Sequence, residues 1–340
     1  MQLQTTVVIP KSRIRIGHSG GIVLLGSCFA DNIGMRLKSA KFNTLCNPFG
    51  TLYNPASIAW HLDRCMDAAV MSDTSDDLFV DGVGIWHSWM HHTSFSAPTE
   101  QELSYKINHA WQETSNALRR AKTLIVTFGT AIVYTLSDSG RIVANCHKQP
   151  DSLFKRRWLS PEEISGSWMP IIQRLKAINP DIDIIFTVSP IRHKRDGLHA
   201  NQVSKATLLL AVDRIIQEAQ SMSGTGAVEY FPSYEIMMDE LRDYRFYADD
   251  MIHPSELAVE YIWERVSDTY MNRPTKELMS QLVKITKALQ HRPIGPDTQA
   301  YHKFIGDTSN IIDNMRQQHP YIDLDKEKEI CNTLLEKYQA

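Results

Sequence analysis

The sequence IVLLGSCFADNIGMRL, residues 22–37, decides the fold because it joins two hydrophobic patterns through one glycine. Residues 22–25 form a short, continuous run of branched apolar side chains, which is typical of a strand buried on both faces. From Phe29 to Leu37 the apolar residues recur with the spacing of an amphipathic helix. Gly26 lies between the two patterns and permits a sharp bend of the backbone. We therefore predict a buried strand, a tight turn and a helix.

Ser27 and Cys28 place two potential nucleophiles side by side on this turn. Either side chain is expected near the free N–H groups and the positive dipole end of the new helix, an environment that favours an anion. A cysteine there is expected to have a lowered pKa, whereas a serine would still need a neighbouring base. The alternative interpretation is a turn of small residues with a buried, inert cysteine.

Three further apolar runs indicate buried strands, and helical patterns separate them. The strands are expected at residues 123–128, 182–188 and, with a weaker pattern, 227–231; the helices are expected at 98–121, 161–178 and 201–221. Because the connections are long enough for crossovers, this alternation predicts an α/β fold with an open parallel sheet covered by helices on both faces.

Polar clusters follow the predicted strands, at the edge of the sheet where sites form in such folds. They are Ser27-Cys28, Gly129-Thr130, the segment Ser189-Pro190-Ile191-Arg192-His193 and a segment that ends at His253. Arg192 and His193 are suited to binding a carboxylate or phosphate of a substrate through charged hydrogen bonds. The alternative is a structural ion pair with Asp196.

Asp250 and His253 stand three residues apart, just before a helical pattern. On a turn that enters a helix, both side chains can point into one cleft, and the carboxylate can hold the imidazole in the tautomer that acts as a base. Helix entries commonly carry Asp and His for capping alone. Together with the turn at Ser27-Cys28, however, the pair supplies the base that a nucleophile needs.

The chain is expected to form an α/β domain over residues 1–272 and a helical appendage over 273–340. A long insertion, at about residues 47–100, lies between the first two strands and has turn signals at residues 47–51 and 53–55 and a polar loop at 73–77. Insertions of this length are often functional. From Arg273 onward the composition shifts to Lys, Glu and Gln around two helical patterns.

Composition and charge limit the classes of partner. The chain has 340 residues, of which 43% are hydrophobic and 22% charged, so it can bury a sizeable core. Its formal net charge of −3 gives no electrostatic footprint for binding nucleic acid or an anionic membrane. No apolar stretch reaches the roughly 18 residues of a membrane helix, and residues 1–6 lack the features of a secretory signal. We expect a cytoplasmic protein.

Cysteine and histidine spacing gives no sign of a metal or a disulfide framework. The five cysteines are scattered, without a Cys-x-x-Cys pair, and are expected to be reduced thiols. His87, His91 and His92 have a spacing that suits a metal, but no carboxylate pattern accompanies them and tryptophans surround them. We expect a packed loop there that lines the cleft, and no metal site.

Six motifs together resemble the GSCFA family, over residues from about 20 to 270. They are GSCFA at 26–30, NPFGT at 47–51, TFGTA at 127–131, NCHK at 145–148, SPIRH at 189–193 and DDMIH at 249–253. That family is grouped with the SGNH, or GDSL-type, hydrolases. The resemblance implies a three-layer α/β/α sandwich and an enzyme that hydrolyses or transfers acyl groups on oxygen.

The resemblance also implies roles for particular residues. An ungapped match places Cys28 at the position of the nucleophilic serine and Ser27 at that of an aspartate, so we favour Cys28 and keep Ser27 as the alternative. Asp250 then resembles the orienting carboxylate and His253 the base. Gly50 is the candidate oxyanion glycine.

The family pattern is broken at the asparagine that normally donates to the oxyanion. Ala131 stands at that position, two residues after Gly129, and cannot donate. Thr130 or Asn145 are possible substitutes, and Asn145 has the more suitable amide chemistry. His147 is a further residue expected to reach the cleft.

The leading hypothesis is therefore an acyl-ester hydrolase or acyltransferase that requires no cofactor. An O-acylated carbohydrate is the substrate expected by family analogy. The alternative is a non-catalytic module that binds a glycan or a protein in the same cleft, with Ala131 as a sign of lost hydrolysis.

Overall fold

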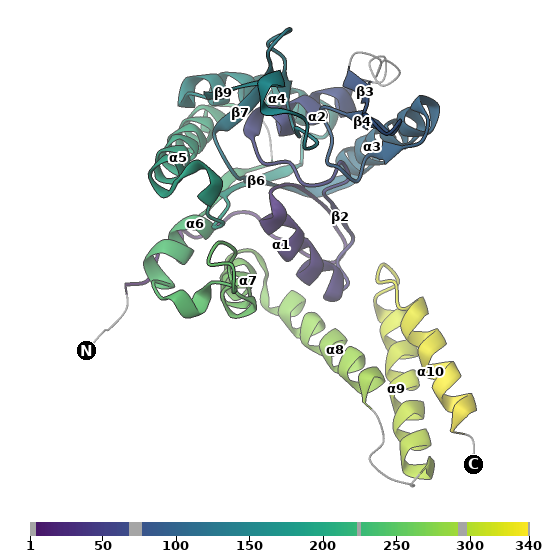
Figure 1. Ribbon diagram of the computed structural model, residues 1–340. Helices are drawn as coiled ribbons and strands as arrows, with labels where there is room; N and C mark the ends of the chain where they lie inside the picture. Colours follow the sequence, from purple (N-terminus) through teal and green to yellow (C-terminus); the bar gives the residue numbers. More distant parts are fainter. Residues whose placement is uncertain (1–4, 68–76, 223–225, 292–297, 339–340) are drawn as a thin grey trace.

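A five-stranded parallel sheet forms the centre of the molecule (Figure 1). The computed structural model describes residues 5–67, 77–222, 226–291 and 298–338. The strand order is β11-β10-β6-β1-β2, and every neighbouring pair is parallel. The bounds are β1 Gly21–Gly26, β2 Thr44–Cys46, β6 Ala121–Phe128, β10 Asp183–Val188 and β11 Val228–Phe231. The predicted α/β class with a parallel sheet is confirmed.

Helices cover both faces of this sheet and complete the three layers. The alternating side chains of β1 divide between two cores: Val23 and Leu25 pack with one group of helices, Ile22 and Leu24 with the other. On the first face lie α2 Pro55–Met66, α3 Glu100–Arg120, α4 Pro161–Ile178 and α5 Leu198–Gln220. On the second lie α1 Cys28–Ser39 and α7 Glu256–Tyr270.

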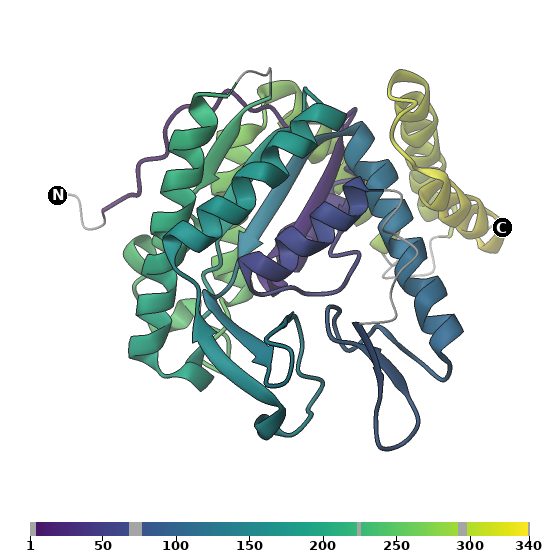
Figure 2. The same cartoon turned by 90° about the horizontal axis from the view of Figure 1, so that it is seen from above.

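Two small antiparallel sheets accompany the central sheet, one after α2 and the other directly after β6 (Figure 2). One belongs to the insertion and contains β3 Leu78–Val80, β4 Trp86–Ser88 and β5 Ser96–Ala97. The other contains β7 Ile132–Leu136, β8 Ile142–Val143 and β9 Phe154–Trp158. The turn expected at residues 53–55 is instead the start of α2, because Asn54 caps that helix and Pro55 occupies its first turn.

Between β11 and α7 the chain forms α6 Ser233–Glu235, a π-helical turn at Ile236–Glu240 and a 3-10 turn at Tyr244–Phe246. Two further 3-10 turns of the same length occur at Asp151–Leu153 and Lys194–Asp196. Residues 1–4, on which part of the localisation prediction rests, and residues 73–76 of the expected polar loop lie outside the described ranges.

The last three helices have an apolar core of their own. They are α8 Arg273–Gln290, α9 Thr298–Gln318 and α10 Asp325–Lys337 (Figure 1). Their shared core includes Leu282, Ile305 and Cys331. Lys41, two residues after the end of α1, forms an ion pair of 2.6 Å with Glu327 in α10. Across the described ranges, no helix has the length and apolar character needed to cross a bilayer.

Candidate active site

The β1–α1 turn depends on Gly26 for a close approach between two strands. Gly26 has a φ of 141°, and a Cβ atom added to it would overlap the carbonyl of Thr127 in β6. Its N–H donates to Asn47 Oδ1 at 2.9 Å. Only glycine fits this position, so the chain turns sharply at the carboxyl end of the sheet and begins α1 there.

Ser27 and Cys28 differ in their partners. Ser27 is 1% exposed, and its Oγ accepts the N–H of Phe29 at 3.3 Å, which makes it the N-cap of α1. Cys28 is half-buried, and its Sγ lies 3.7 Å from Nε2 of His253. The sulfur of Cys28, and not the oxygen of Ser27, is therefore next to the imidazole.

His253 and Asp250 form a hydrogen-bonded pair. Nδ1 of His253 lies 2.6 Å from Oδ2 of Asp250, while Oδ1 of Asp250 accepts the N–H groups of Ile252 and His253. These hydrogen bonds lower the pKa of Asp250 to about 2, the backbone N–H of His253 contributing most. The carboxylate thus favours the tautomer in which Nδ1 carries the proton and the Nε2 lone pair faces Cys28.

The expectation of a lowered pKa for Cys28 is wrong. Burial raises the pKa of the Cys28 thiol, and the carboxylate of Asp31 acts in the same direction. The N–H groups at the start of α1 and the ammonium of Lys205 oppose this rise without overcoming it. At neutral pH the resting group is therefore a thiol, which needs His253 to take its proton before or during an attack.

Lys205, which the sequence analysis did not select, lies beneath this site. It belongs to α5, is 0% exposed, and its Nζ donates at 2.7 Å to both the Gly129 and Ser189 carbonyls. These carbonyls follow β6 and β10, so Lys205 ties two of the loops at the carboxyl edge of the sheet. The spacing of the helix could have indicated that Lys205 is buried, because it lies on the same face of α5 as Leu208 and Val212.

Arg192 does not form the ion pair with Asp196 that was the alternative to a contact with substrate. Asp196 pairs with Arg156 at 3.0 Å. The Arg192 guanidinium instead lies 4.0 Å from the centre of the Tyr247 ring, and it lines a cavity of about 210 Å³ together with Tyr244. Its backbone N–H donates to the carbonyl of Ile252 at 3.2 Å, which places it beside the loop that carries His253.

His193 packs edge-on against Tyr53, with ring centres 6.1 Å apart. Burial lowers the pKa of His193 to about 4, and the ammonium of Lys205 adds to this effect. Its Nε2 atom is buried and has no hydrogen-bond partner within the described ranges. His193 is thus a neutral imidazole near the site, and its partnerless ring nitrogen is shielded from solvent.

The backbone donors expected to form an oxyanion hole are already engaged. The N–H of Gly50 donates to the Asn47 carbonyl at 2.8 Å, and those of Gly129 and Thr130 donate to the Tyr53 carbonyl at 2.8 and 2.9 Å. The Thr130 hydroxyl lies 3.1 Å from that of Ser204. The predicted oxyanion roles of Gly50 and Thr130 are corrected, because their N–H groups, like that of Gly129 in the polar cluster after β6, hold loops together and do not point at the cleft.

Asn145 and His147 are also engaged elsewhere. The Asn145 side chain accepts the N–H of His147 at 2.8 Å, and its own N–H donates to Trp89. Nε2 of His147 lies 2.7 Å from the Ser88 carbonyl, and its ring is buried beside His87. The prediction that His147 reaches the cleft is therefore wrong, and the contacts of Asn145 join it to the insertion.

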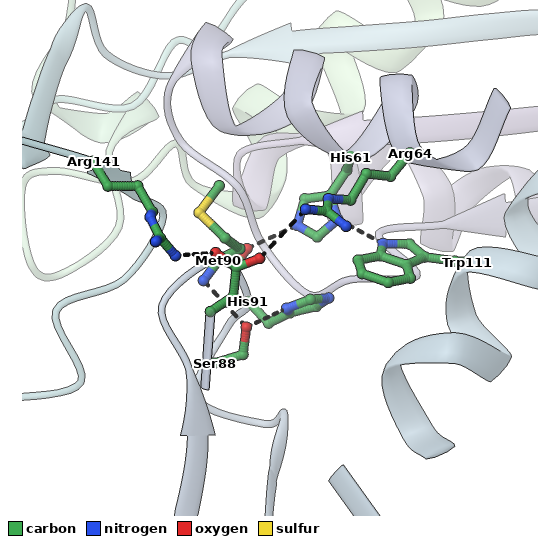
Figure 3. A network of polar contacts seen from close by, with 8 residues as sticks. His61, Arg64, Ser88, Met90, His91, Trp111 and Arg141 are labelled. Carbon is green, nitrogen blue, oxygen red and sulfur yellow. Dashed lines mark hydrogen bonds and ion pairs between the residues drawn. The ribbon is translucent and has the colours of Figure 1, made fainter. Parts of the chain in front are cut away.

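The histidines of the insertion form a packed polar network (Figure 3). Trp111 donates to Nδ1 of His61, whose Nε2 lies 2.7 Å from the Met90 carbonyl, while Ser88 bonds Nδ1 of His91. His61 also stacks on Phe49, with ring centres 4.1 Å apart. Within the described ranges no three His, Cys, Asp or Glu side chains converge as metal ligands. The network supports the loop at residues 47–51.

Two family models match the chain. The one described as GSCFA family matches residues 21–266, and the one described as GSCFA domain protein, C-terminal domain, matches residues 283–337. A search of curated proteins found no match. Among solved structures, the chain is similar to an acetyl xylan esterase (Est2A) from the rumen bacterium Butyrivibrio proteoclasticus, with 9% identity and a TM-score of 0.35. The alignment covers 74% of this chain and 63% of that one, which is less than two thirds of its length.

Proposed function

The chain belongs to the GSCFA family, and on that premise we propose that it is a cysteine-dependent acyl-ester hydrolase or acyltransferase of the SGNH type. One observation carries the proposal: Cys28, His253 and Asp250 are linked in series. Cys28 Sγ lies 3.7 Å from His253 Nε2, and His253 Nδ1 lies 2.6 Å from Asp250 Oδ2. A nucleophile, a base and a group that orients the base are the parts that acyl transfer requires.

In the first half of the reaction, Sγ of Cys28 attacks the carbonyl carbon of the ester while Nε2 of His253 takes the thiol proton. We place the resulting oxyanion near the start of α1, where the backbone N–H groups of Cys28 and Phe29 already act on the sulfur and favour negative charge. When the tetrahedral intermediate collapses, the alkoxide leaves with the proton from His253. A thioester remains on Cys28.

In the second half, His253 takes a proton from water or from an acceptor hydroxyl, and the oxygen attacks the thioester. Collapse of this second intermediate returns the proton to Cys28 and releases an acid or a new ester. Because a thioester transfers readily to either nucleophile, the choice between hydrolysis and transfer depends on which one reaches the site. His253 is 46% exposed, so both have access to it.

Arg192 is the proposed contact for the rest of the substrate. Its guanidinium has no carboxylate partner in the described part of the chain, and it lines the cavity beside the His253 loop. A guanidinium of this kind favours a substrate with a carboxylate or phosphate. An O-acylated carbohydrate fits the reaction class by family analogy.

Trapping of the acyl-enzyme tests the proposal. The protein is mixed with a chromogenic acetate ester, quenched in acid and digested, and the acetylated peptide is located by mass spectrometry. We expect the acetyl group on Cys28, removed by neutral hydroxylamine as a thioester is, and absent in His253→Ala. An acetyl group on Ser27, or turnover that survives Cys28→Ala, would contradict it. If Cys28 also fails to react faster than the other cysteines with iodoacetamide, a non-catalytic binding module is the better description.

A further inference from the structure

The side chain of Asn47 bridges the two ends of the segment that carries the nucleophile. Its Oδ1 accepts the N–H of Gly26 at 2.9 Å, and its Nδ2 donates to Oδ1 of Asp31 at 2.8 Å. Gly26 ends β1, and Asp31 lies in the first turn of α1. Cys28 stands between these two residues in the chain. One amide therefore holds the end of the strand and the start of the helix at a fixed separation on either side of Cys28.

The backbone of Asn47 explains why an asparagine suits this position. Strand β2 pairs with β1 as far as Cys46, and the N–H of Asn47 extends the ladder by donating to the Leu24 carbonyl at 2.9 Å. The chain then turns away, because Asn47 has a φ of 44°, and its carbonyl accepts the N–H of Gly50. In a continuing parallel ladder that carbonyl would accept the N–H of Gly26. The side-chain oxygen accepts it instead, and Asn is one of the few residues that tolerate a positive φ.

We propose that Asn47 is a positioning residue for Cys28, which fixes α1 against β1 and so maintains the 3.7 Å separation between Cys28 Sγ and His253 Nε2. It does not touch the substrate. Transfer of the thiol proton requires this approach, and a displacement of about 1 Å can slow a reaction by about a hundredfold. The catalytic consequence rests on the proposed function, but the geometric role itself does not.

Asn179 provides a matched control. Its Nδ2 also joins two segments, because it donates to the carbonyls of Leu118 and Ala121 at 2.8 Å each. These carbonyls lie where α3 ends and β6 begins, at the opposite edge of the sheet from Cys28. Asn47→Gly and Asn179→Ala thus each remove one bridging amide. Glycine is chosen at position 47 because an alanine would be strained at a positive φ.

The first test measures the rate at which iodoacetamide alkylates Cys28 at neutral pH, read by mass spectrometry. We expect Asn47→Gly to react more slowly than the wild type, because the sulfur is no longer held beside its base, and Asn179→Ala to react at the wild-type rate. Adding Asn47→Gly to His253→Ala should slow the reaction no further, since both changes remove the same contact. An amide with a merely structural role would lower the free energy of unfolding in both asparagine variants and leave the rate unchanged.

Two results would overturn the proposal. One is a folded Asn47→Gly protein that keeps the wild-type alkylation rate. The other is a combined variant that reacts more slowly than His253→Ala alone, because Asn47 would then act independently of the Cys28–His253 contact.

A second test keeps a side chain at both ends of the bridge, in case Asn47→Gly does not fold. Asn47→Asp places two carboxylates across the 2.8 Å contact with Asp31, and their repulsion should open it and slow the alkylation of Cys28. Adding Asp31→Asn restores one donor and one acceptor to the contact at the wild-type net charge, so the rate should return toward that of the wild type. A double variant as slow as Asn47→Asp alone would overturn the proposal.

The two proposals fail separately. Alkylation uses no ester, so the expected rates without any ester turnover would refute the enzyme and leave the role of Asn47 standing. If the enzyme is correct, kcat for an ester should fall by about tenfold or more in Asn47→Gly, with KM near the wild-type value. Turnover that depends on Cys28 and His253 but is unchanged in Asn47→Gly would refute the role of Asn47 alone.

Discussion

Ser27 and Cys28 are neighbours in the chain but have unrelated partners: Ser27 Oγ caps α1 through the N–H of Phe29, and Cys28 Sγ lies 3.7 Å from His253 Nε2. The difference follows from the turn at Gly26, because the N-cap residue points its side chain back at the helix N–H groups. The first residue of the helix then faces the opening at the edge of the sheet. Adjacent side chains therefore serve stability and chemistry separately.

Alanine substitutions should separate these two roles. Cys28→Ala is expected to abolish acyl-ester turnover and leave the free energy of unfolding close to that of the wild type. Ser27→Ala is expected to keep turnover but to lower the free energy of unfolding by about 1 kcal/mol, as loss of an N-cap usually does. Urea unfolding and a chromogenic ester assay measure both. Loss of turnover in a stably folded Ser27→Ala would contradict the assignment.

Much of the fold could be predicted because its main strands are continuous apolar runs. The helix at Pro161–Ile178 was predicted with both ends correct, since Ser160 and Glu163 form a capping box and Pro161 follows the cap. Strand β2 was missed because its three residues, at the edge of the sheet, are only half-buried and show no run. Patterns of this kind detect burial, and a short edge strand has little of it.

Candidate side chains of the site could be selected from the sequence, because their chemistry depends on residue type. The hydrogen bonds of the surrounding backbone could not be predicted, because they join segments that are distant in the sequence. Residue types and spacing indicated Ser27-Cys28, Asp250 and His253 as a candidate site, the family resemblance favoured Cys28, and the structure brings Cys28, His253 and Asp250 together. The engagement of the Gly50, Gly129 and Thr130 N–H groups was not predicted, because it depends on carbonyls that only the tertiary fold brings near. Lys205 was missed for a related reason: a lysine in a helix suggests solvent, and its spacing with Leu208 was the only sign of burial.

Arg192 should control affinity for anionic substrates. Arg192→Met is expected to raise KM about tenfold for an acyl ester that carries a carboxylate or phosphate, since a charged hydrogen bond is lost. KM for a neutral ester should stay the same. Arg195→Met is the control, because that arginine is three residues away and its side chain is 82% exposed. Equal KM values in wild type and Arg192→Met would exclude this role.

The buried histidines should make the protein sensitive to acid. Burial lowers the pKa of His61 to about 3 and that of His147 to about 4, against an ordinary value of 6.5 for both. Between pH 6.5 and 4 the unfolded chain therefore binds more protons than the folded protein. As the pH is lowered through this range, the free energy of unfolding decreases by about 1.4 kcal/mol per pH unit for each additional proton. Their contribution is fully present above pH 6.5.

His147→Gln tests this effect on one group. A glutamine amide can still donate to the Ser88 carbonyl but does not titrate. We expect the slope of the free energy of unfolding between pH 6.5 and 5 to decrease by about one proton. His109→Gln, at an exposed position of α3, should leave the slope unchanged. Urea unfolding at several pH values measures it, and the same slope in all three proteins would contradict the assignment.

Gly26 and Gly166 should respond in opposite ways to alanine. At Gly26 the φ of 141° is strained for any other residue, and the new Cβ would overlap the Thr127 carbonyl in the adjacent strand. Relief would require β1 and β6 to separate, which would also move Cys28 away from His253. Gly26→Ala should therefore lower the free energy of unfolding by more than about 3 kcal/mol and reduce ester turnover in whatever protein still folds.

Gly166 lies on the exposed side of α4, and an added Cβ there meets nothing within 4 Å. Alanine favours the helix over glycine by about 0.5–1 kcal/mol, so Gly166→Ala should raise the free energy of unfolding by that amount with turnover unchanged. Chemical denaturation and the ester assay on both variants decide the matter. A Gly26→Ala protein as stable and as active as the wild type would mean that the contact between β1 and β6 can relax, and that the turn does not fix the position of Cys28.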